Sequence, residues 1–157
     1  MKTSRLVLEP VTVAFARAVL AGSASGAAEG WPHADTFDAL RPYAEHGDDA
    51  VPGPWLIRLD GAIIGECGWY GPPGDDGEVE IGYGLAAPFR GNGYGTEAVR
   101  ALVTWVVAQP GVRRVVAEAE ATNLPSRRVL ERLGFAVTEV RDALVRYSLD
   151  GFDAATT

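Results

Sequence analysis

The sequence predicts one α/β domain, and three features of the 157-residue chain support this prediction. Segments in which apolar and polar side chains alternate occur along the whole chain, as expected of strands. Segments with apolar side chains every three or four residues lie between them, as expected of helices. The chain shows no internal repeat and no linker, and its length suits a single hydrophobic core. We therefore expect one domain over residues 1–149, followed by a loose tail at residues 150–157.

Seven strands are predicted, and turn residues separate most of them. Asp60 and Gly61 form the clearest turn, because this pair tolerates the positive φ angles of a tight hairpin. The fourth strand reads Glu-Val-Glu-Ile-Gly-Tyr-Gly-Leu, so its two faces differ. The predicted strands are residues 5–10, 55–59, 62–70, 78–85, 114–121, 136–140 and 143–149.

Four helices are predicted between these strands. Asp35 is the expected cap of the second helix, and Pro110 marks the end of the third. Asn123 suits the N-cap of the fourth helix, Pro125 suits its first turn, and Gly134 suits a left-handed C-terminal cap. The predicted helices lie within residues 11–21, 35–46, 98–110 and 123–134.

Composition and charge exclude several classes of protein. The chain is 47% hydrophobic and 22% charged, which is ordinary for a globular protein and too apolar for a disordered one. Its net charge of −7 makes it a poor general binder of nucleic acid. No apolar run approaches the roughly 18 residues of a membrane span. The single cysteine, Cys67, excludes an internal disulfide, so we expect a cytoplasmic protein. The negative charge and the short apolar runs lead us to expect no nucleic-acid or membrane partner.

The charge is distributed unevenly along the chain. Residues 1–87 hold five basic and thirteen acidic side chains, whereas residues 88–149 hold nine basic and six acidic ones. The first part therefore favours a cation and the second an anion. His33 and His46 have no cysteine pair or His-Glu motif beside them, so no metal site is expected.

A glycine-rich loop, Arg-Gly-Asn-Gly-Tyr-Gly-Thr at residues 90–96, joins a predicted strand to a predicted helix. Glycines at alternate positions let the main chain turn tightly and approach a ligand closely. The helix that follows presents free N–H groups and the positive end of its dipole, which favours a pyrophosphate. A Walker loop needs a lysine after its last glycine, but the only lysine is Lys2. The dinucleotide pattern fits poorly, because Thr96 stands where its third glycine belongs.

A third phosphate-binding pattern, Arg/Gln-x-x-Gly-x-Gly, is satisfied by Arg90, Gly93 and Gly95. The later segment that begins at Asn123 reads Asn-x-x-Ser…Glu-x-x-Gly-Phe, and Glu80 begins a Glu-Ile-Gly-Tyr stretch before the loop. With these motifs, residues 4–149 resemble the GNAT superfamily of N-acetyltransferases, in particular the ribosomal-protein alanine N-acetyltransferase (RimJ/RimL-like) branch. The resemblance implies a mixed, mostly antiparallel sheet of about seven strands, splayed between the fourth and fifth and flanked by about four helices.

The resemblance also implies that acetyl-coenzyme A is the cosubstrate and that no metal is needed. A main-chain N–H near Leu85 would polarise the thioester carbonyl, an effect commonly worth about 3 kcal/mol. Amides of the glycine loop would hold the pyrophosphate, and Asn123 would bond the pantetheine arm. The implied coenzyme-binding residues are Leu85, Arg90, Gly91, Asn92, Gly93, Tyr94, Gly95, Thr96, Asn123 and Arg128.

The implied reaction is direct attack of a primary amine on the acetyl carbon in a ternary complex. A protonated amine has no lone pair, so a base must take its proton; Glu80 is the first candidate and Glu118 the second. Many family members carry a tyrosine acid seven residues after the asparagine, where this chain has Leu130. Ser126 is therefore assigned as the hydrogen-bond donor or relay toward the leaving thiolate.

The acceptor is expected to be a peptide N-terminus or a small-molecule amine, attracted by the acidic first part of the chain. The candidate acceptor-binding residues are Trp31, His33, Trp69 and Tyr83. Two alternatives stay open: a catalytically silent sensor or scaffold that binds acetyl-coenzyme A, and a structural protein whose glycine loop binds nothing. Family habit also allows a homodimer.

Overall fold

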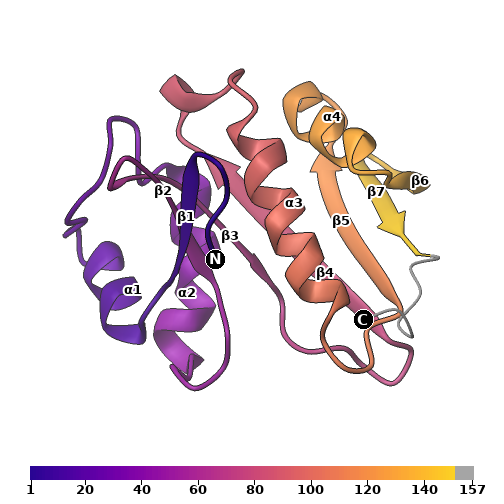
Figure 1. The fold of residues 1–157 in the computed structure, drawn as a ribbon, viewed down its shortest axis with the longest axis horizontal. Helices are drawn as coiled ribbons and strands as arrows, with labels where there is room; N and C mark the ends of the chain where they lie inside the picture. Colours follow the sequence, from indigo (N-terminus) through magenta and orange to yellow (C-terminus); the bar gives the residue numbers. More distant parts are fainter. Residues whose placement is uncertain (151–157) are drawn as a thin grey trace.

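The computed structural model describes residues 1–150, which form a seven-stranded sheet with four α-helices (Figure 1). The strands are β1 (Leu6–Pro10), β2 (Trp55–Leu59), β3 (Ala62–Trp69), β4 (Glu78–Leu85), β5 (Arg114–Glu120), β6 (Ala136–Arg141) and β7 (Leu144–Leu149). The helices are α1 (Val13–Leu20), α2 (Ala34–His46), α3 (Tyr94–Val107) and α4 (Leu124–Arg132), with one 3₁₀ turn, η1 (Ala87–Phe89). The predicted α/β class is confirmed.

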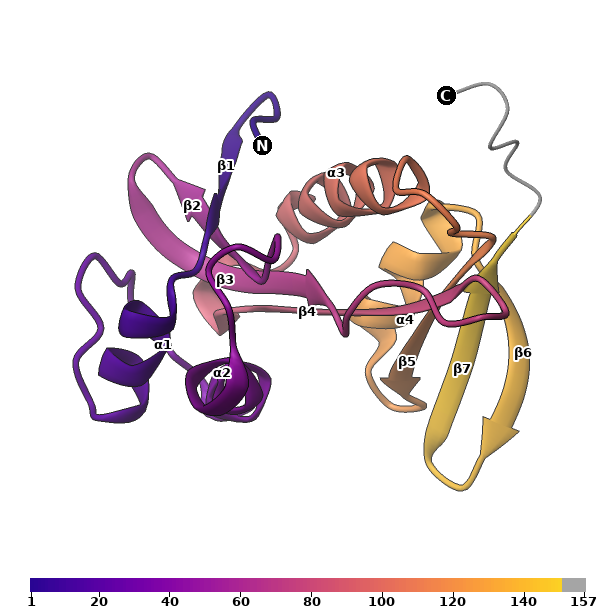
Figure 2. The ribbon, with the colours of Figure 1, turned by 90° about the horizontal axis from the view of Figure 1, so that it is seen from below.

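The strands follow the order β1-β2-β3-β4-β5-β7-β6, and every neighbouring pair is antiparallel except β4 and β5. The parallel pairing of β4 with β5 runs only from Glu78↔Arg114 to Ile81↔Ala117. Beyond this point the two strands diverge, and Figure 2 shows β5, β7 and β6 turned steeply away from β4. The splay expected between the fourth and fifth strands is therefore confirmed.

Helices cover both faces of the sheet: α1 and α2 lie on one face and α3 on the other (Figure 2). α3 buries an apolar stripe against the sheet and packs beside α4. The stripe consists of Ala98, Val99, Leu102, Val103 and Val106. A second cluster lies under α1 and α2. Each fully buried valine or leucine contributes about 1.5–3 kcal/mol, so these clusters hold the helices on the sheet.

A β-bulge in β3 decides which of its side chains face α2. Ile57 of β2 pairs with Gly65, but the next residue, Arg58, pairs with Ile63, so Ile64 is an extra residue. An extra residue reverses the alternation of side chains beyond it. Glu66 consequently lies on the same face as Ile63, against α2, where strict alternation would have placed it on the α3 face.

Most local signals act as the sequence predicts. Asp60 and Gly61 have φ angles of 49° and 85°, which form the expected hairpin turn. Asn123 caps α4, because its Oδ1 accepts a hydrogen bond from the N–H of Ser126 at 3.2 Å. Gly134 has a φ of 92° just beyond α4, in the left-handed region.

The predicted cap of α2 was wrong. The helix begins at Ala34, and His33 is its N-cap residue. The main-chain N–H of His33 donates to Thr36 Oγ1 at 3.3 Å, which closes the helix start and leaves Asp35 in the first turn. A threonine three residues after the cap can satisfy this N–H as a glutamate would in a capping box.

The end of the described chain is tied to the sheet. Asp150, expected in a loose tail, accepts a hydrogen bond from Arg114 Nε at 3.0 Å. The rest of that predicted tail, residues 151–157, lies outside the described residues. No helix within residues 1–150 has the length and apolar character needed to cross a membrane.

Candidate active site

The loop between β4 and α3 leads into a helix N-terminus that no side chain of residues 1–150 caps. Gly91 and Gly93 have φ angles of 83° and 82°, which side chains other than glycine rarely adopt. Gly93 is the N-cap of α3, and no side chain of residues 1–150 caps the helix. The first intrahelical bond runs from the N–H of Glu97 to Gly93 O, so the N–H groups of residues 94–96 have no helical acceptor. These groups and the helix dipole suit a phosphate.

The edge of β4 is open toward the splay. The C=O of Glu80 and the N–H of Ala86 bond on the β3 side. Main-chain groups alternate between the two neighbours of a strand, so those of Tyr83 and Leu85 point to the side that β5 has left. Arg90 Nε donates to Leu85 O at 3.1 Å, which leaves the Leu85 N–H facing the gap.

A cavity of about 410 Å³ joins the splay, the glycine loop and α4. Eight of the ten predicted coenzyme-binding residues line it: Leu85, Arg90, Gly91, Gly93, Gly95, Thr96, Asn123 and Arg128. Asn92 and Tyr94 do not line it. Asn92 Nδ2 instead donates to Phe89 O and Arg90 O at 3.5 and 3.3 Å, which shapes the loop. The ring of Tyr94 lies 4.5 Å from the guanidinium carbon of Arg5.

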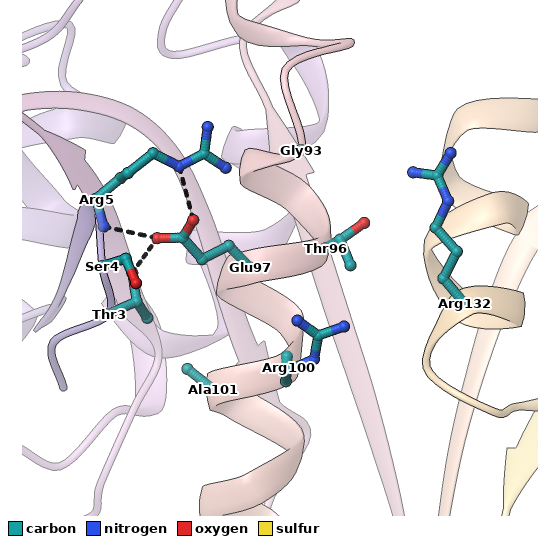
Figure 3. Close-up of a pocket in the computed structure, with 9 residues that line it drawn as sticks. All are labelled: Thr3, Ser4, Arg5, Gly93, Thr96, Glu97, Arg100, Ala101 and Arg132. Carbon is teal, nitrogen blue, oxygen red and sulfur yellow. Dashed lines mark hydrogen bonds and ion pairs between the residues drawn. The ribbon is translucent and has the colours of Figure 1, made fainter.

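A second cavity, of about 520 Å³, shares Gly93, Thr96 and Arg132 with the first and is shown in Figure 3. Arg132 reaches from α4 toward α3, and Arg100 lies on the flank of α3 (Figure 3). Arg5 also lines this cavity, where its Nε donates to Glu97 Oε1 at 2.8 Å. The sequence analysis missed these three arginines. Spacing was the available signal, because Arg100 lies one helical turn after the glycine loop.

Tyr83 and Ser126 meet in the first cavity. The Tyr83 hydroxyl donates to Ser126 O at 2.9 Å, and Ser126 Oγ donates to the Tyr83 hydroxyl, also at 2.9 Å. Burial raises the pKa of Tyr83 to about 12, so its hydroxyl stays protonated at neutral pH. Leu130, at the position of the family's usual tyrosine, is fully buried. Tyr83, predicted on the acceptor side, therefore faces α4 instead.

Glu80 lies on the opposite face of β4 from Tyr83. Within residues 1–150 its carboxylate has no hydrogen-bond or ion-pair partner, whereas Glu118 binds Arg146 at 2.9 Å. Burial, followed by the charge of Glu118, raises the pKa of Glu80 above its ordinary value. A free carboxylate with a raised pKa suits a general base better than one held in an ion pair.

The predicted acceptor-binding aromatics do not gather in one site. Trp69 packs edge-on against Trp105 of α3 with ring centroids 4.8 Å apart, and it lines neither cavity. Trp31 is 4% exposed and stacks on Phe15. Trp31 is a core residue, and Trp69 is partly buried against the core, so both rings contribute mainly to packing. His33 lines the first cavity beside the glycine loop.

Glu66 is a candidate that the sequence analysis missed. It is 4% exposed, and its Oε1 accepts hydrogen bonds from Trp31 Nε1 at 3.3 Å and from Thr36 Oγ1. His33 Nε2 lies 3.5 Å from the same oxygen. The Glu66 carboxylate raises the pKa of His33, while burial opposes this shift. No sequence signal pointed to Glu66, because the bulge that turns it toward α2 leaves no mark in the pattern.

The family described as "Acetyltransferase (GNAT) domain" matches residues 5–136. The uncharacterized N-acetyltransferase YjdG of Bacillus subtilis is 32% identical over 111 residues, which are 67% of this chain and 66% of that protein. The matched stretches span 45% to 66% of the length of the curated relatives.

Solved structures share the fold. RimL, a ribosomal L7/L12 α-N-protein acetyltransferase in complex with coenzyme A, matches with a TM-score of 0.70 and 18% identity over 97% of both chains. The microcin C7 self-immunity acetyltransferase MccE, in complex with acetyl-CoA and AMP, matches with a TM-score of 0.67 and 17% identity over 94% of this chain and 93% of that chain. The family match covers most of the sequence. The chain therefore belongs to the GNAT acetyltransferase family, and its cavity lies within the matched domain.

Proposed function

We propose that the protein transfers an acetyl group from acetyl-coenzyme A to a primary amine, a protein N-terminus or a small-molecule amine, by direct attack in a ternary complex. One observation carries this proposal. A single cavity joins an uncapped, glycine-led helix N-terminus to the open edge of β4. The helix N-terminus suits the pyrophosphate of coenzyme A. The open strand edge suits the pantetheine arm, whose amide groups can pair with the main chain.

The residues present suit the phosphates of the coenzyme. The N–H groups of residues 94–96 and the positive-φ glycines of the loop would hold the pyrophosphate. The second cavity adds Arg5, Arg100 and Arg132, whose guanidinium groups would bind the 3′-phosphate of the ribose. Its one acidic residue, Glu97, is already paired with Arg5 at 2.8 Å. The cavity therefore keeps a net positive charge.

The open edge of β4 would hold the pantetheine arm. The Leu85 N–H faces the gap and would polarise the thioester carbonyl, at about 3 kcal/mol for one such donor. Asn123 lines the cavity, but its Oδ1 already caps α4. Its Nδ2 is the donor left to bond the arm.

Glu80 is the proposed proton acceptor, because its carboxylate is free and its pKa is raised. It lies four residues before Gly84, about 13 Å along a strand at 3.3 Å per residue. The proton would therefore reach Glu80 through water. On the other face of β4, the Tyr83 hydroxyl donates to Ser126 O and Ser126 Oγ donates to the Tyr83 hydroxyl, so one of them would rotate to donate its single proton to the leaving thiolate instead. A thiolate leaves readily near neutral pH, so this donation assists the reaction without being essential.

The acceptor side of the splay is acidic, which supports an amine over a hydroxyl or thiol acceptor. Asp35 lines the cavity, and Glu66 and Glu80 lie on the same face of the sheet. A relative such as YjdG is itself an N-acetyltransferase. A cytoplasmic location, supported by the single and buried Cys67, and a homodimer complete the proposal.

A thermal-shift assay with acetyl-coenzyme A, followed by an amine panel with thiol detection, tests this function. Ligand at 100 times its Kd stabilises a protein by about 2.7 kcal/mol, so we expect a clear rise in Tm. We then expect thiol release only when a primary amine is present. Binding without release from any amine would support the silent sensor or scaffold, and no shift at all would support a structural protein.

A further inference from the structure

The carboxylate of Glu66 and the imidazole of His33 converge over Gly84 of β4. A Cβ added to this glycine would lie 2.7 Å from Glu66 Oε2 and 3.0 Å from His33 Nε2. Within residues 1–150, the hydrogen bonds to Glu66 all reach Oε1, and none reaches Oε2. His33 Nε2 is buried and also has no hydrogen-bond partner there. Glu66 Oε1 lies 3.5 Å from this buried nitrogen, which is longer than a normal hydrogen bond, so Nε2 beside Oε2 points to a ligand.

The two atoms lie beside the proposed acyl site. Glu66 pairs directly with Gly84 across the β3–β4 ladder, and Gly84 precedes Leu85. His33 and Gly84 both line the cavity that holds the Leu85 N–H. Because glycine has no side chain, the Glu66 carboxylate and the His33 ring pack closely over its Cα at the wall of the cavity. A group bound there lies next to the carbon that an acceptor must attack.

The chemistry of this site selects a cation that donates hydrogen bonds. The Glu66 side chain is 6% exposed and acceptor-only when ionised. The donors nearest to it, on Trp31 and Thr36, are already used by Oε1. Asp35 adds a second negative charge at the cavity wall, and Arg90 is the neighbouring positive charge. An ammonium group offers several N–H donors and a matching charge, whereas a hydroxyl offers one donor and no charge.

We propose that Glu66 Oε2 and His33 Nε2 bind the amino group of the acceptor and thereby make the enzyme specific for primary amines. This inference rests on the proposed acetyl transfer, to which it adds an acceptor site. Trp31 and Thr36 are positioning residues, because they hold the Glu66 carboxylate through its other oxygen.

The site predicts a pH dependence of amine binding. Charged groups face His33 from three elements: Glu66 of β3 and Asp35 of α2 raise its pKa, and Arg90 of the loop after η1 lowers it. The pKa of His33 therefore lies above the ordinary value for histidine, with the Glu66 carboxylate as the main cause. A protonated His33 loses its lone pair at Nε2 and repels an ammonium group. Amine affinity therefore falls as the pH drops through the pKa of His33.

Binding to the protein–coenzyme A complex, measured by calorimetry, tests the proposal without requiring turnover. The probes are spermidine, a tripeptide amide with a free N-terminus, and their fully N-acetylated counterparts. We expect Glu66→Gln to weaken binding of at least one free amine tenfold or more, while acetyl-coenzyme A binding changes less than twofold. Glu139→Gln, an exposed strand residue paired with Arg141, is the control and leaves both affinities unchanged. His33→Gln removes the pH dependence.

Two further outcomes bear on the proposal. If Glu66→Gln does not fold, Gly84→Ala keeps the negative charge, but its Cβ displaces Glu66 Oε2, which would lie only 2.7 Å away, so it must also reduce amine affinity. Unchanged amine binding in a folded variant, or no amine binding by the wild type, overturns the proposal. Glu66 Oε2 and His33 Nε2 would then bind water and not the acceptor. Failure of acetyl transfer with amine binding intact would instead count against the proposed function.

Discussion

Under the proposed function, the two sides of the splay recognise their ligands in different ways. The side that faces α3 and α4 uses main-chain groups of two short segments, residues 90–96 and 123–126, with arginines around them. The side that faces α2 uses individual carboxylates and an imidazole from three separate elements: His33, Glu66 and Glu80. The first side is basic and the second is acidic, which matches the uneven charge of the chain.

This difference shows which level of structure determines the binding of each ligand. A pyrophosphate is bound by N–H groups that every residue carries, so a turn of the right shape is sufficient. An amine needs particular side chains at particular points, and these come from residues more than thirty positions apart. The coenzyme side therefore depends on local conformation, and the acceptor side depends on the assembled sheet.

The largest expected effect is on the acceptor side, at Glu80. We expect Glu80→Gln to lower kcat by about 100- to 1,000-fold, as loss of a general base does. In the wild type, kcat falls as the pH drops through the pKa of Glu80, and burial moves that fall above the pH of an ordinary carboxyl. The variant loses this acidic limb. Glu118→Gln, whose carboxylate pairs with Arg146, is the control and stays within a few fold. Near-normal turnover in Glu80→Gln would show that Glu80 is not the general base.

The next largest effect concerns Gly93 of the glycine loop. Comparing it with Gly61 separates a loss of coenzyme affinity from a loss of protein stability. Gly93 and Gly61 have nearly equal φ angles of 82° and 85°. Alanine at either position costs about 1–2 kcal/mol of stability, because a Cβ is disfavoured there. Only Gly93→Ala disturbs the helix terminus, so we expect it alone to weaken acetyl-coenzyme A about 100-fold, or about 2.8 kcal/mol. Thermal melts and calorimetry measure the two quantities. Equal coenzyme affinity in both variants would contradict the phosphate role of the loop.

A smaller effect concerns the arginines of the second cavity. Arg132→Ala is expected to weaken acetyl-coenzyme A about tenfold, because a charge-assisted hydrogen bond contributes about 1.5–3 kcal/mol. The variant and the wild type should bind 3′-dephospho-coenzyme A equally well, since the lost partner is the 3′-phosphate. Arg141→Ala, an exposed residue of β6, controls for net charge. Equal losses with both ligands would place Arg132 elsewhere on the coenzyme.

The smallest effect compares the two hydroxyls that face α4. Tyr83→Phe is expected to lower kcat about tenfold and Ser126→Ala about threefold, which is below the usual range for acid catalysis because the thiolate leaves readily. The two hydroxyls are 2.9 Å apart and act together, so the double variant should lose little more than Tyr83→Phe. Single-turnover rates measure the step. A larger loss in Ser126→Ala would make the serine the direct donor.

Local features of the fold and site were predictable from sequence because they depend on neighbouring residues. Asn123 caps α4, Gly134 ends it, and Asp60-Gly61 turns the hairpin, each through the torsions of a few residues. The glycine loop was recognised in the same way. The family resemblance added the splay, which no periodicity in residues 78–85 reveals.

Long-range features were not predictable in this way. Tryptophan is a common ligand-binding residue type, but the register of β3 directs the side chain of Trp69 toward Trp105. Arg132 joins the coenzyme side only because α4 packs beside α3. Tyr83 takes the place near Ser126 because β4 and α4 meet across the splay.

The sequence by itself determined the order of the elements, the phosphate-binding turn and the family, because torsional preferences and hydrogen bonds between near neighbours are encoded locally. Tertiary structure alone decided the acceptor side. One extra residue, Ile64, reverses the alternation of β3 and turns Glu66 toward His33. The physical reason is that a strand's two faces differ by a single position, and only pairing with neighbouring strands selects between them.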